Sequence, residues 1–345
     1  MRRRPLIFSA IGLAVLLIAY PIYWFVLARI VARDIADWAT QRRAEGFVVT
    51  IGAPVIGGFP LAVRAQMATP NITAPDGLWH WQGPDTELRV APWTPLDLKF
   101  SSPGHHRFTI AGSTPRDVAL DAIEFALGID IRNDGRLTNF TLDLAEAVLT
   151  DNLSGTAKVA RAAMRGHLPW PASNDLALSS LDLTIDAAGI DLPPTVRAAL
   201  GQRIEKFHLV SQVMGMVPPA MPREALAGWR DAGGVFQLRE SEISWGPLWA
   251  AGDGTLALDQ AMQPLAAGTV RIAGLTETLD ALTASGMLQS EPAKLAQVMF
   301  GALARPPAEG GRPEVRLPLS IQNGFVYMGP IKLARVQPID WSGLP

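Results

Sequence analysis

The sequence predicts a mainly β fold with a few short helices, in which an extended, curved antiparallel sheet follows one N-terminal transmembrane helix. Two observations lead to this prediction. Residues 5–28 carry no charged side chain, and beyond Gly46 the chain changes to short alternating runs broken by glycine, proline, asparagine and aspartate. A long apolar run is typical of a membrane-spanning helix, whereas a period of two residues is typical of half-buried strands.

The apolar run has the length of a membrane span. As an α-helix, residues 5–28 would reach roughly 36 Å, enough to cross a hydrocarbon core of about 30 Å. A secretory signal peptide has a shorter apolar core and a small-x-small cleavage site, and no such site follows this run. We therefore interpret it as an uncleaved anchor rather than a signal peptide or a buried core helix. Tyr20, Tyr23 and Trp24 stand near its C-terminal end, where amphipathic rings favour the headgroup region.

Arginines flank the run on both sides, so the charge rule alone does not fix its orientation. Arg2, Arg3 and Arg4 lie directly before it, whereas the arginines after it are mixed with acidic residues. The compact cluster favours a short tail on the cytoplasmic side of the membrane and a body on the outer side. The absence of cysteine agrees with an exported body and excludes thiolate or disulfide chemistry.

The chain is predicted to have three segments: a cytoplasmic tail and transmembrane anchor over residues 1–28, a connecting helix over 29–46, and a β-rich domain outside the membrane over 47–345. Val31, Ile35 and Trp38 recur at helical spacing in the connector, and Gly46 is a suitable end. The connector could lie on the membrane surface, but docking on the body is the favoured reading. A fragment without residues 1–45 is expected to be soluble and rich in strand.

Alternation and turn residues locate the elements of the body. Strands are expected at residues 61–67, 137–144, 176–185, 235–243, 255–258, 269–272 and 318–328. Helices are expected at residues 196–204, 223–231, 276–285 and 292–303; proline or N-cap residues mark several of their starts. Residues 305–313 are expected to form a flexible loop.

A weak internal repeat consists of an aromatic residue shortly before Gly-Pro, and it occurs in three places. In two of them one further residue separates the aromatic residue from the glycine. These places are residues 81–84, 245–247 and 327–330. They indicate one supersecondary unit used twice, with a partial third copy, which would extend a sheet by similar meanders. Coincidence among 31 glycines and 28 prolines remains the alternative.

The sequence shows no catalytic, cofactor or metal motif. None of the five histidines has a partner at the spacing of a helical metal site, and His105-His106 follow a Pro-Gly turn, where a solvated pair is expected. No G-x-S-x-G occurs. The expected site is therefore non-catalytic, with no cofactor, and the ligand-binding residues are unassigned. A net charge of −2 argues against nucleic acid as a partner.

Several short features together resemble a bacterial family known as domain of unknown function 2125. They are the N-terminal span, Gly57-Gly58-Phe59-Pro60-Leu61 before a strand, the Trp-Gly-Pro turns, and the strand at residues 318–328. The resemblance implies a protein of the Gram-negative envelope with no assigned activity, anchored in the bacterial inner membrane by a single span. It makes the β-rich domain at residues 47–345 a periplasmic domain. More distantly, residues 245–274 are similar to the strand-turn-strand units of AsmA-like envelope proteins, which implies a curved sheet with an apolar groove for lipid.

Two functions follow as hypotheses. The first is a non-enzymatic body that binds or handles phospholipid or another envelope lipid during envelope maintenance. The second is a scaffold that binds other envelope proteins and has no small ligand. In the first hypothesis alternating strand positions line an open groove rather than a packed core. The candidate lining residues are Val63, Ala65, Met67, Leu181, Leu183 and Ile185.

Overall fold

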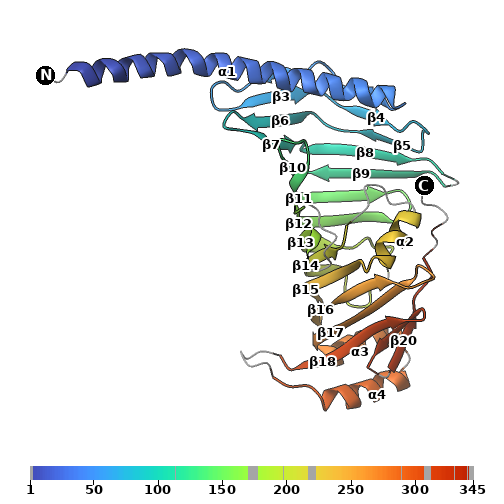
Figure 1. Cartoon of the computed structure of the whole chain (residues 1–345). Helices are drawn as coiled ribbons and strands as arrows, with labels where there is room; N and C mark the ends of the chain where they lie inside the picture. Colours follow the sequence, from blue (N-terminus) through green and yellow to red (C-terminus); the bar gives the residue numbers. More distant parts are fainter. Residues whose placement is uncertain are drawn as a thin grey trace. The chain divides into compact units, whose positions relative to one another are not determined.

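The structure is a computed structural model, and it describes residues 3–112, 114–169, 178–196, 198–216, 223–288, 290–306, 312–329, 331–339 and 341. The chain divides into two compact units: unit 1 comprises residues 1–137 and 142–153, and unit 2 comprises residues 138–141 and 154–345. The described part is mainly antiparallel sheet with few helices, as predicted (Figure 1).

The helices and strands of the two units are as follows. Unit 1 contains α1 (Arg3–Ala44), β1 (Val48–Thr50), β2 (Val55–Gly57), β3 (Val63–Met67), β4 (Asn71–Thr73), β5 (Trp79–Gln82), β6 (Thr86–Ala91), β7 (Thr94–Ser101), β8 (Gly104–Ile110), β9 (Arg116–Ala122), β10 (Glu124–Ile131) and most of β11 (Leu137–Asp151). Unit 2 contains β12 (Gly155–His167), β13 (Ser179–Asp191), β14 (Arg203–Met214), α2 (Arg223–Asp231), β15 (Val235–Trp245), β16 (Leu248–Leu258), β17 (Pro264–Ala273), α3 (Leu275–Ala284), α4 (Ser290–Gly301), β18 (Glu314–Gln322), β19 (Phe325–Met328) and β20 (Ile331–Arg335).

Helix α1 is continuous from Arg3 to Ala44, so the anchor and the connecting helix of the sequence form one element. By its length and composition α1 is able to cross a membrane. Its N-terminal part extends beyond the strands of unit 1, and its C-terminal part lies along them (Figure 1). The helix ends where expected, since Gly46 follows with a φ of 93° and its N–H bonds the carbonyl of Arg43.

The strands of unit 1 form two antiparallel ladders. One ladder has the order β2–β3–β6–β7–β10, and the other has the order β1–β4–β5–β8–β9–β11. The chain passes from one ladder to the other at short breaks, two of which are Gly83-Pro84-Asp85 and Ser102-Pro103. Because proline has no N–H to donate to a neighbouring strand, these breaks end one ladder and begin the next.

Unit 1 has its apolar core between α1 and the first ladder. Trp24, Leu27 and Val31 of the helix pack on Val63 and other side chains of β3 and β6, and these residues are at most 9% exposed. The expectation that Val63, Ala65 and Met67 line an open cavity is therefore wrong. Their alternation correctly indicated an apolar face, but α1 covers it. A fragment without residues 1–45 would lose this covering helix, so we no longer expect that fragment to fold stably.

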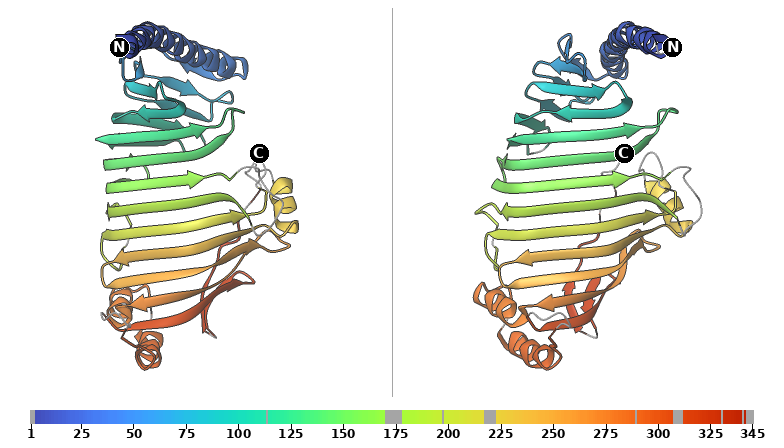
Figure 2. Two further views of the ribbon diagram at one scale, coloured as in Figure 1. Left: turned by 60° about the vertical axis from the view of Figure 1, so that its left-hand side comes forward. Right: turned by 90° about the vertical axis from the view of Figure 1, so that its left-hand side faces the viewer.

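Unit 2 is an antiparallel meander in which β12 to β20 pair in sequence order. Its strands lie side by side in both views of Figure 2. The connections after β15, β18 and β19 have two residues each, whereas those after β14 and β17 contain the helices. Strands β12 to β18 have 9 to 13 residues each. An open meander of this kind has two faces, and the alternation of each strand decides which face is apolar.

Three of the four helices predicted for the body are confirmed as α2, α3 and α4, within two residues at each end. The fourth, at residues 196–204, is wrong. Its described residues form turns that lead into β14, and Gly201 has a φ of 106°. The local preference of Ala198, Ala199 and Leu200 for helix is outweighed by pairing of the following residues with β13.

The three aromatic Gly-Pro sequences do not occupy equivalent positions. Trp245 ends β15, and Gly246 and Pro247 form its turn to β16. Residues 81–82, by contrast, end β5, and the Gly-Pro that follows them begins a break between strands of different ladders. Residues 327–329 lie at the end of β19, and residue 330 is outside the described part. The structure therefore gives no support for residues 81–84 as a copy of the unit at residues 245–247.

Gly246→Ala is expected to lower the free energy of unfolding by about 1–3 kcal/mol or more. Gly246 has a φ of 55°, and a Cβ atom there would lie 2.1 Å from the carbonyl oxygen of Leu200. Gly228→Ala is the matched control, because its Cβ would meet open space within α2 and alanine is favoured there by roughly 0.5–1 kcal/mol. Chemical denaturation followed by circular dichroism compares the two; equal stability would contradict the expectation.

Candidate apolar binding face

One face of the unit 2 meander consists almost wholly of apolar side chains. On β13 the alternate residues Leu181, Leu183 and Ile185 share this face, as the sequence predicted. Their cross-strand partners on β14 are Val213, Ser211 and Leu209. The same register places further residues of β14 to β18 on this face: Phe207, Phe236, Leu238, Ile243, Ala250, Leu256, Val270, Ile272, Leu317 and Leu319. We call these residues, with Leu181, Leu183, Ile185, Leu209, Ser211 and Val213, the apolar face of unit 2.

Most side chains of the apolar face of unit 2 are only partly buried. Leu181, Leu183 and Ile185 are all intermediate in exposure, as are their neighbours Leu209 and Val213. In unit 1, by contrast, the strand residues that α1 covers are at most 9% exposed. Half-buried leucines and isoleucines at the middle of long strands therefore indicate a face that the described residues do not cover with a second layer.

A buried cluster does exist at one end of this face. Val315 and Leu317 of β18 are 2% and 6% exposed, and they pack with Leu275 of α3 and Ala304. In Figures 1 and 2 the two C-terminal helices lie beside the last strands of the meander. The helices thus supply a core for β17 to β19, while the apolar side chains of β13 to β15 stay partly exposed.

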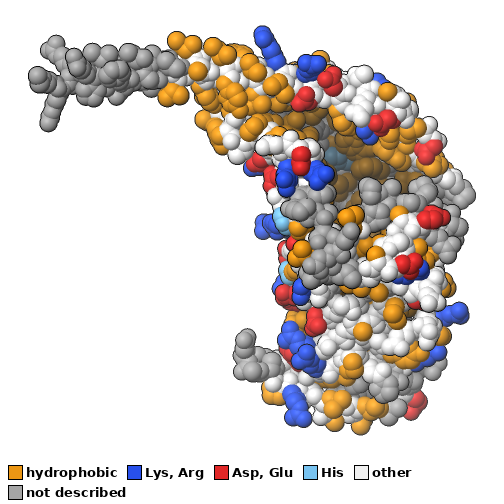
Figure 3. All heavy atoms as spheres, in the orientation of Figure 1, with side chains coloured by type: hydrophobic (Ala, Val, Ile, Leu, Met, Phe, Trp, Pro, Cys, Tyr) orange, Lys and Arg blue, Asp and Glu red, His pale blue; other side chains and the backbone are white. Residues whose placement is uncertain are grey.

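The opposite face of the same strands is polar and hydrogen-bonded. His208 Nδ1 lies 2.7 Å from Asp186 Oδ1, and Gln212 Nε2 donates to Asp182 Oδ1 at 2.8 Å. Lys206 Nζ also donates to Glu242 at 2.8 Å. Charged side chains gather along one side of unit 2 in Figure 3. Because charged groups prefer water, these hydrogen-bonded polar side chains mark the solvated face of the sheet. The opposite, apolar face is therefore the candidate for binding.

The Lys206–Glu242 pair makes part of the stability of unit 2 dependent on pH. The hydrogen bond from Lys206 lowers the pKa of the Glu242 carboxyl, an effect that outweighs burial, which raises it; Trp249 donates a further hydrogen bond. A carboxyl whose pKa is lowered in the folded state stabilises the fold above its unfolded pKa, and this contribution is lost as pH falls through the folded pKa. We expect Lys206→Met to reduce the acid sensitivity of thermal unfolding. An unchanged acid profile would contradict this assignment.

Unit 1 also carries an apolar face, on the ladder that runs from β1 to β11. Trp79, Phe108 and Ile110 lie on neighbouring strands in register and are 38–44% exposed. The ring of Trp81 packs against Phe108 at 6.3 Å between centroids. No residue of this face was predicted as a site. The signal that could have located it is the alternation of Trp79, Trp81, Phe108 and Ile110.

The two adjacent histidines do not form a solvated turn pair, which corrects the expectation from the sequence. Both lie in β8 and point to opposite faces. His105 is exposed and lies 2.8 Å from Asp121, whereas His106 is 1% exposed and its Nε2 lies 2.8 Å from the carbonyl oxygen of Ser102. The ring of His106 is 4.7 Å from that of Phe125. His106 therefore belongs to the structural core of unit 1.

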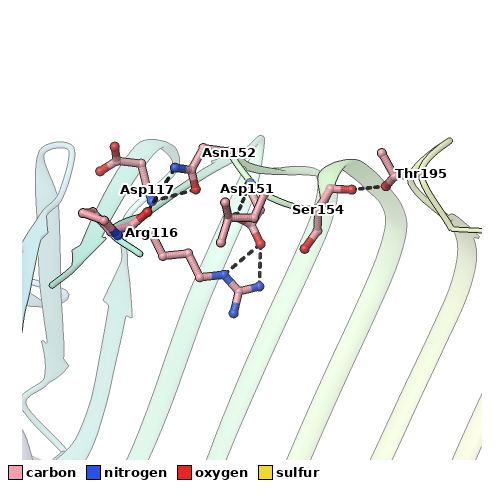
Figure 4. A network of polar contacts seen from close by, with 8 residues as sticks. Arg116, Asp117, Asp151, Asn152, Ser154 and Thr195 are labelled. Carbon is pink, nitrogen blue, oxygen red and sulfur yellow. Dashed lines mark hydrogen bonds and ion pairs between the residues drawn. The ribbon is translucent and has the colours of Figure 1, made fainter. Parts of the chain in front are cut away.

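An ion pair lies at the end of the apolar face of unit 1. Arg116 Nε donates to Asp151 Oδ2 at 2.9 Å, and the backbone N–H of Asp117 bonds the Asn152 side chain at 3.0 Å (Figure 4). Asp151 is only 7% exposed, and its hydrogen bond and charge raise the pKa of the Arg116 guanidinium. The same contacts hold β9 against the end of β11, so we assign them a structural role. In unit 2, Thr195 of the β13–β14 connection donates to the carbonyl of Ser154, the residue before β12.

Comparison with known proteins gives a family but no function. No curated protein matches the chain, and no solved structure matches it. One family model matches residues 24–337, and it describes uncharacterized proteins conserved in bacteria. The match begins at Trp24, which is buried in the core of unit 1, and it includes β1 to β20. The chain therefore belongs to the bacterial family of domain of unknown function 2125.

Proposed function

We propose that this protein is a single-span protein of the bacterial inner membrane whose periplasmic body binds lipid on the apolar face of unit 2. The observation that supports lipid binding most directly is the partial exposure of Leu181, Leu183 and Ile185 on a strand whose other face carries hydrogen-bonded polar side chains. Acyl chains are ligands of matching chemistry, because they gain by leaving water and need no polar partner.

The anchor supports the same proposal. A body held beside a bilayer by α1 encounters phospholipid at very high local concentration, which favours even weak binding. We propose a binding role without catalysis, cofactor or nucleic acid, in keeping with the absence of catalytic motifs from the sequence and its net charge of −2. Handling of phospholipid or another envelope lipid in envelope maintenance is the physiological role that this binding would serve.

Lipid bound to the full chain tests the proposal. The protein is purified in detergent, washed extensively, and its lipid measured by mass spectrometry. We expect at least one phospholipid per chain to remain, because burial of each methylene group of the acyl chains contributes about 0.8 kcal/mol. A folded, monodisperse and lipid-free protein would instead favour the alternative role, a scaffold for other envelope proteins.

Reporter fusions test the location of the body. An enzyme that is active only in the periplasm, fused after Pro345, is expected to be active, because the arginines at residues 2–4 favour the cytoplasmic side. The matched fusion carries a reporter active only in the cytoplasm and is expected to be inactive. The reverse pattern would contradict the proposed orientation.

A further inference from the structure

Two loops of unit 1 lie beside the part of α1 where the apolar run ends. The hydroxyl of Tyr20 donates to the carbonyl of Pro60, in the loop between β2 and β3. The hydroxyl of Tyr23 donates to the carbonyl of Pro92 at 2.7 Å, in the turn between β6 and β7. These bonds hold both loops at the level of helix residues 20–23.

Large apolar side chains project from these loops into solvent. Phe59 is 51% exposed, Leu61 66% and Trp93 67%. The ring of Phe59 packs against Trp24 and Phe25 of the helix, with centroids 5.4 and 6.3 Å apart. We call Phe25, Phe59, Leu61 and Trp93 the interfacial patch. In Figure 3 hydrophobic side chains are dense along α1 next to its grey N-terminal part and just below it.

The length of the helix places this patch relative to a bilayer. From Pro5 to Tyr23 an α-helix rises roughly 28 Å, close to the thickness of a hydrocarbon core of about 30 Å. The core would therefore end near Tyr23, where both loops are bonded to the helix. Aromatic rings are enriched at this depth because they present apolar surface to the acyl chains and polar edges to the headgroups.

We propose that the interfacial patch is inserted into the headgroup region of the same bilayer that α1 crosses, so that unit 1 contacts the membrane through its β2–β3 and β6–β7 loops as well as its helix. The proposal rests on the membrane anchoring proposed above. It goes further, because a helix alone would leave the body free to tilt. Loops bonded to the helix and inserted beside it hold the first ladder of unit 1 directly at the membrane surface.

Single-cysteine labelling tests this contact, since the natural chain has no cysteine. Leu61→Cys and Trp93→Cys are made separately in the full chain, labelled with the environment-sensitive fluorophore NBD, and reconstituted into phosphatidylcholine and phosphatidylglycerol vesicles. Ile123→Cys is the matched control: it is an apolar residue 75% exposed, located between β9 and β10 at the other end of the strands. Leu17→Cys reports on the span itself, because it is 67% exposed on α1.

At positions 61 and 93 we expect blue-shifted emission and strong quenching by lipids with a nitroxide near the headgroup, and weaker quenching by lipids with a nitroxide deep in the acyl chain. Position 123 is expected to show neither effect. Position 17 is expected to be quenched by the deep nitroxide.

Quenching at position 17 with none at positions 61 and 93 would overturn the proposal and leave the anchor intact. Absence of quenching at position 17 would overturn the anchor itself. Protection of positions 61 and 93 by protein contact without lipid quenching would assign the patch to a protein partner and also overturn the proposal.

Discussion

Trp24→Ala is expected to lower the free energy of unfolding of unit 1 by about 3–5 kcal/mol. The side chain is 4% exposed, lies in the core between α1 and the first ladder, and donates from Nε1 to the carbonyl oxygen of Ala62 at 3.1 Å. Alanine would leave a cavity and an unsatisfied carbonyl at the point where the helix meets the sheet. Hydrogen exchange measured by mass spectrometry should show faster exchange of β3 and β6 in the variant.

Ile30→Ala is the control for this effect. Ile30 is also on α1 but is 48% exposed, and a surface substitution of this kind changes stability by about 0.5 kcal/mol or less. If both variants exchange at the same rate as the natural protein, the packing of α1 on unit 1 is not a determinant of its stability. If both are equally unstable, the effect belongs to helix formation and not to the core.

Leu183→Glu is expected to reduce lipid binding by the body about tenfold or more. Burial of a leucine side chain contributes about 1.5–3 kcal/mol, and 1.4 kcal/mol corresponds to a factor of ten in affinity. Glutamate removes this contribution and places a charge among Leu181, Ile185 and the β14 residues that share the face. The lipid that remains with the full chain after detergent washing measures the change.

Thr184→Glu is the matched variant for this experiment. Thr184 is the next residue of β13, so it points to the solvated face of the same strand, where Asp186 and His208 already lie. It adds the same charge to the same strand and is expected to leave lipid binding unchanged. Equal losses in the two variants would show that the charge acts through folding, which circular dichroism of both variants would reveal.

The sequence predicted those elements whose signals are local. An uncharged run and helical spacing predicted α1, and the alternation of Leu181, Leu183 and Ile185 correctly predicted one apolar face of β13. The same alternation in Val63, Ala65 and Met67 also gave an apolar face, but one that α1 covers. Alternation depends only on the contrast between two faces of a strand. What covers a face depends on contacts distant in sequence, so the two cases could not be distinguished before the structure was known.

The errors arise where distant contacts determine the backbone. Residues 198–200 favour helix locally, but residues after them pair with β13 and the chain turns instead. His106 lies four residues from Ser102 across a Pro-Gly sequence that indicates a turn, and its burial depends on the rings of Trp81 and Phe125 from other strands. The interfacial patch likewise joins helix residues with loops some 35 to 70 residues away.

Site-specific photo-crosslinking in native membranes tests lipid binding by the apolar face of unit 2 most directly. Benzoylphenylalanine is introduced at position 183 or at position 184 of the full chain, cells are irradiated, and the purified protein is searched by mass spectrometry for phospholipid adducts. Lipid binding predicts adducts at position 183 on the apolar face and few or none at position 184 on the polar face. Equal adducts at both positions, or protein adducts in place of lipid at position 183, would contradict it.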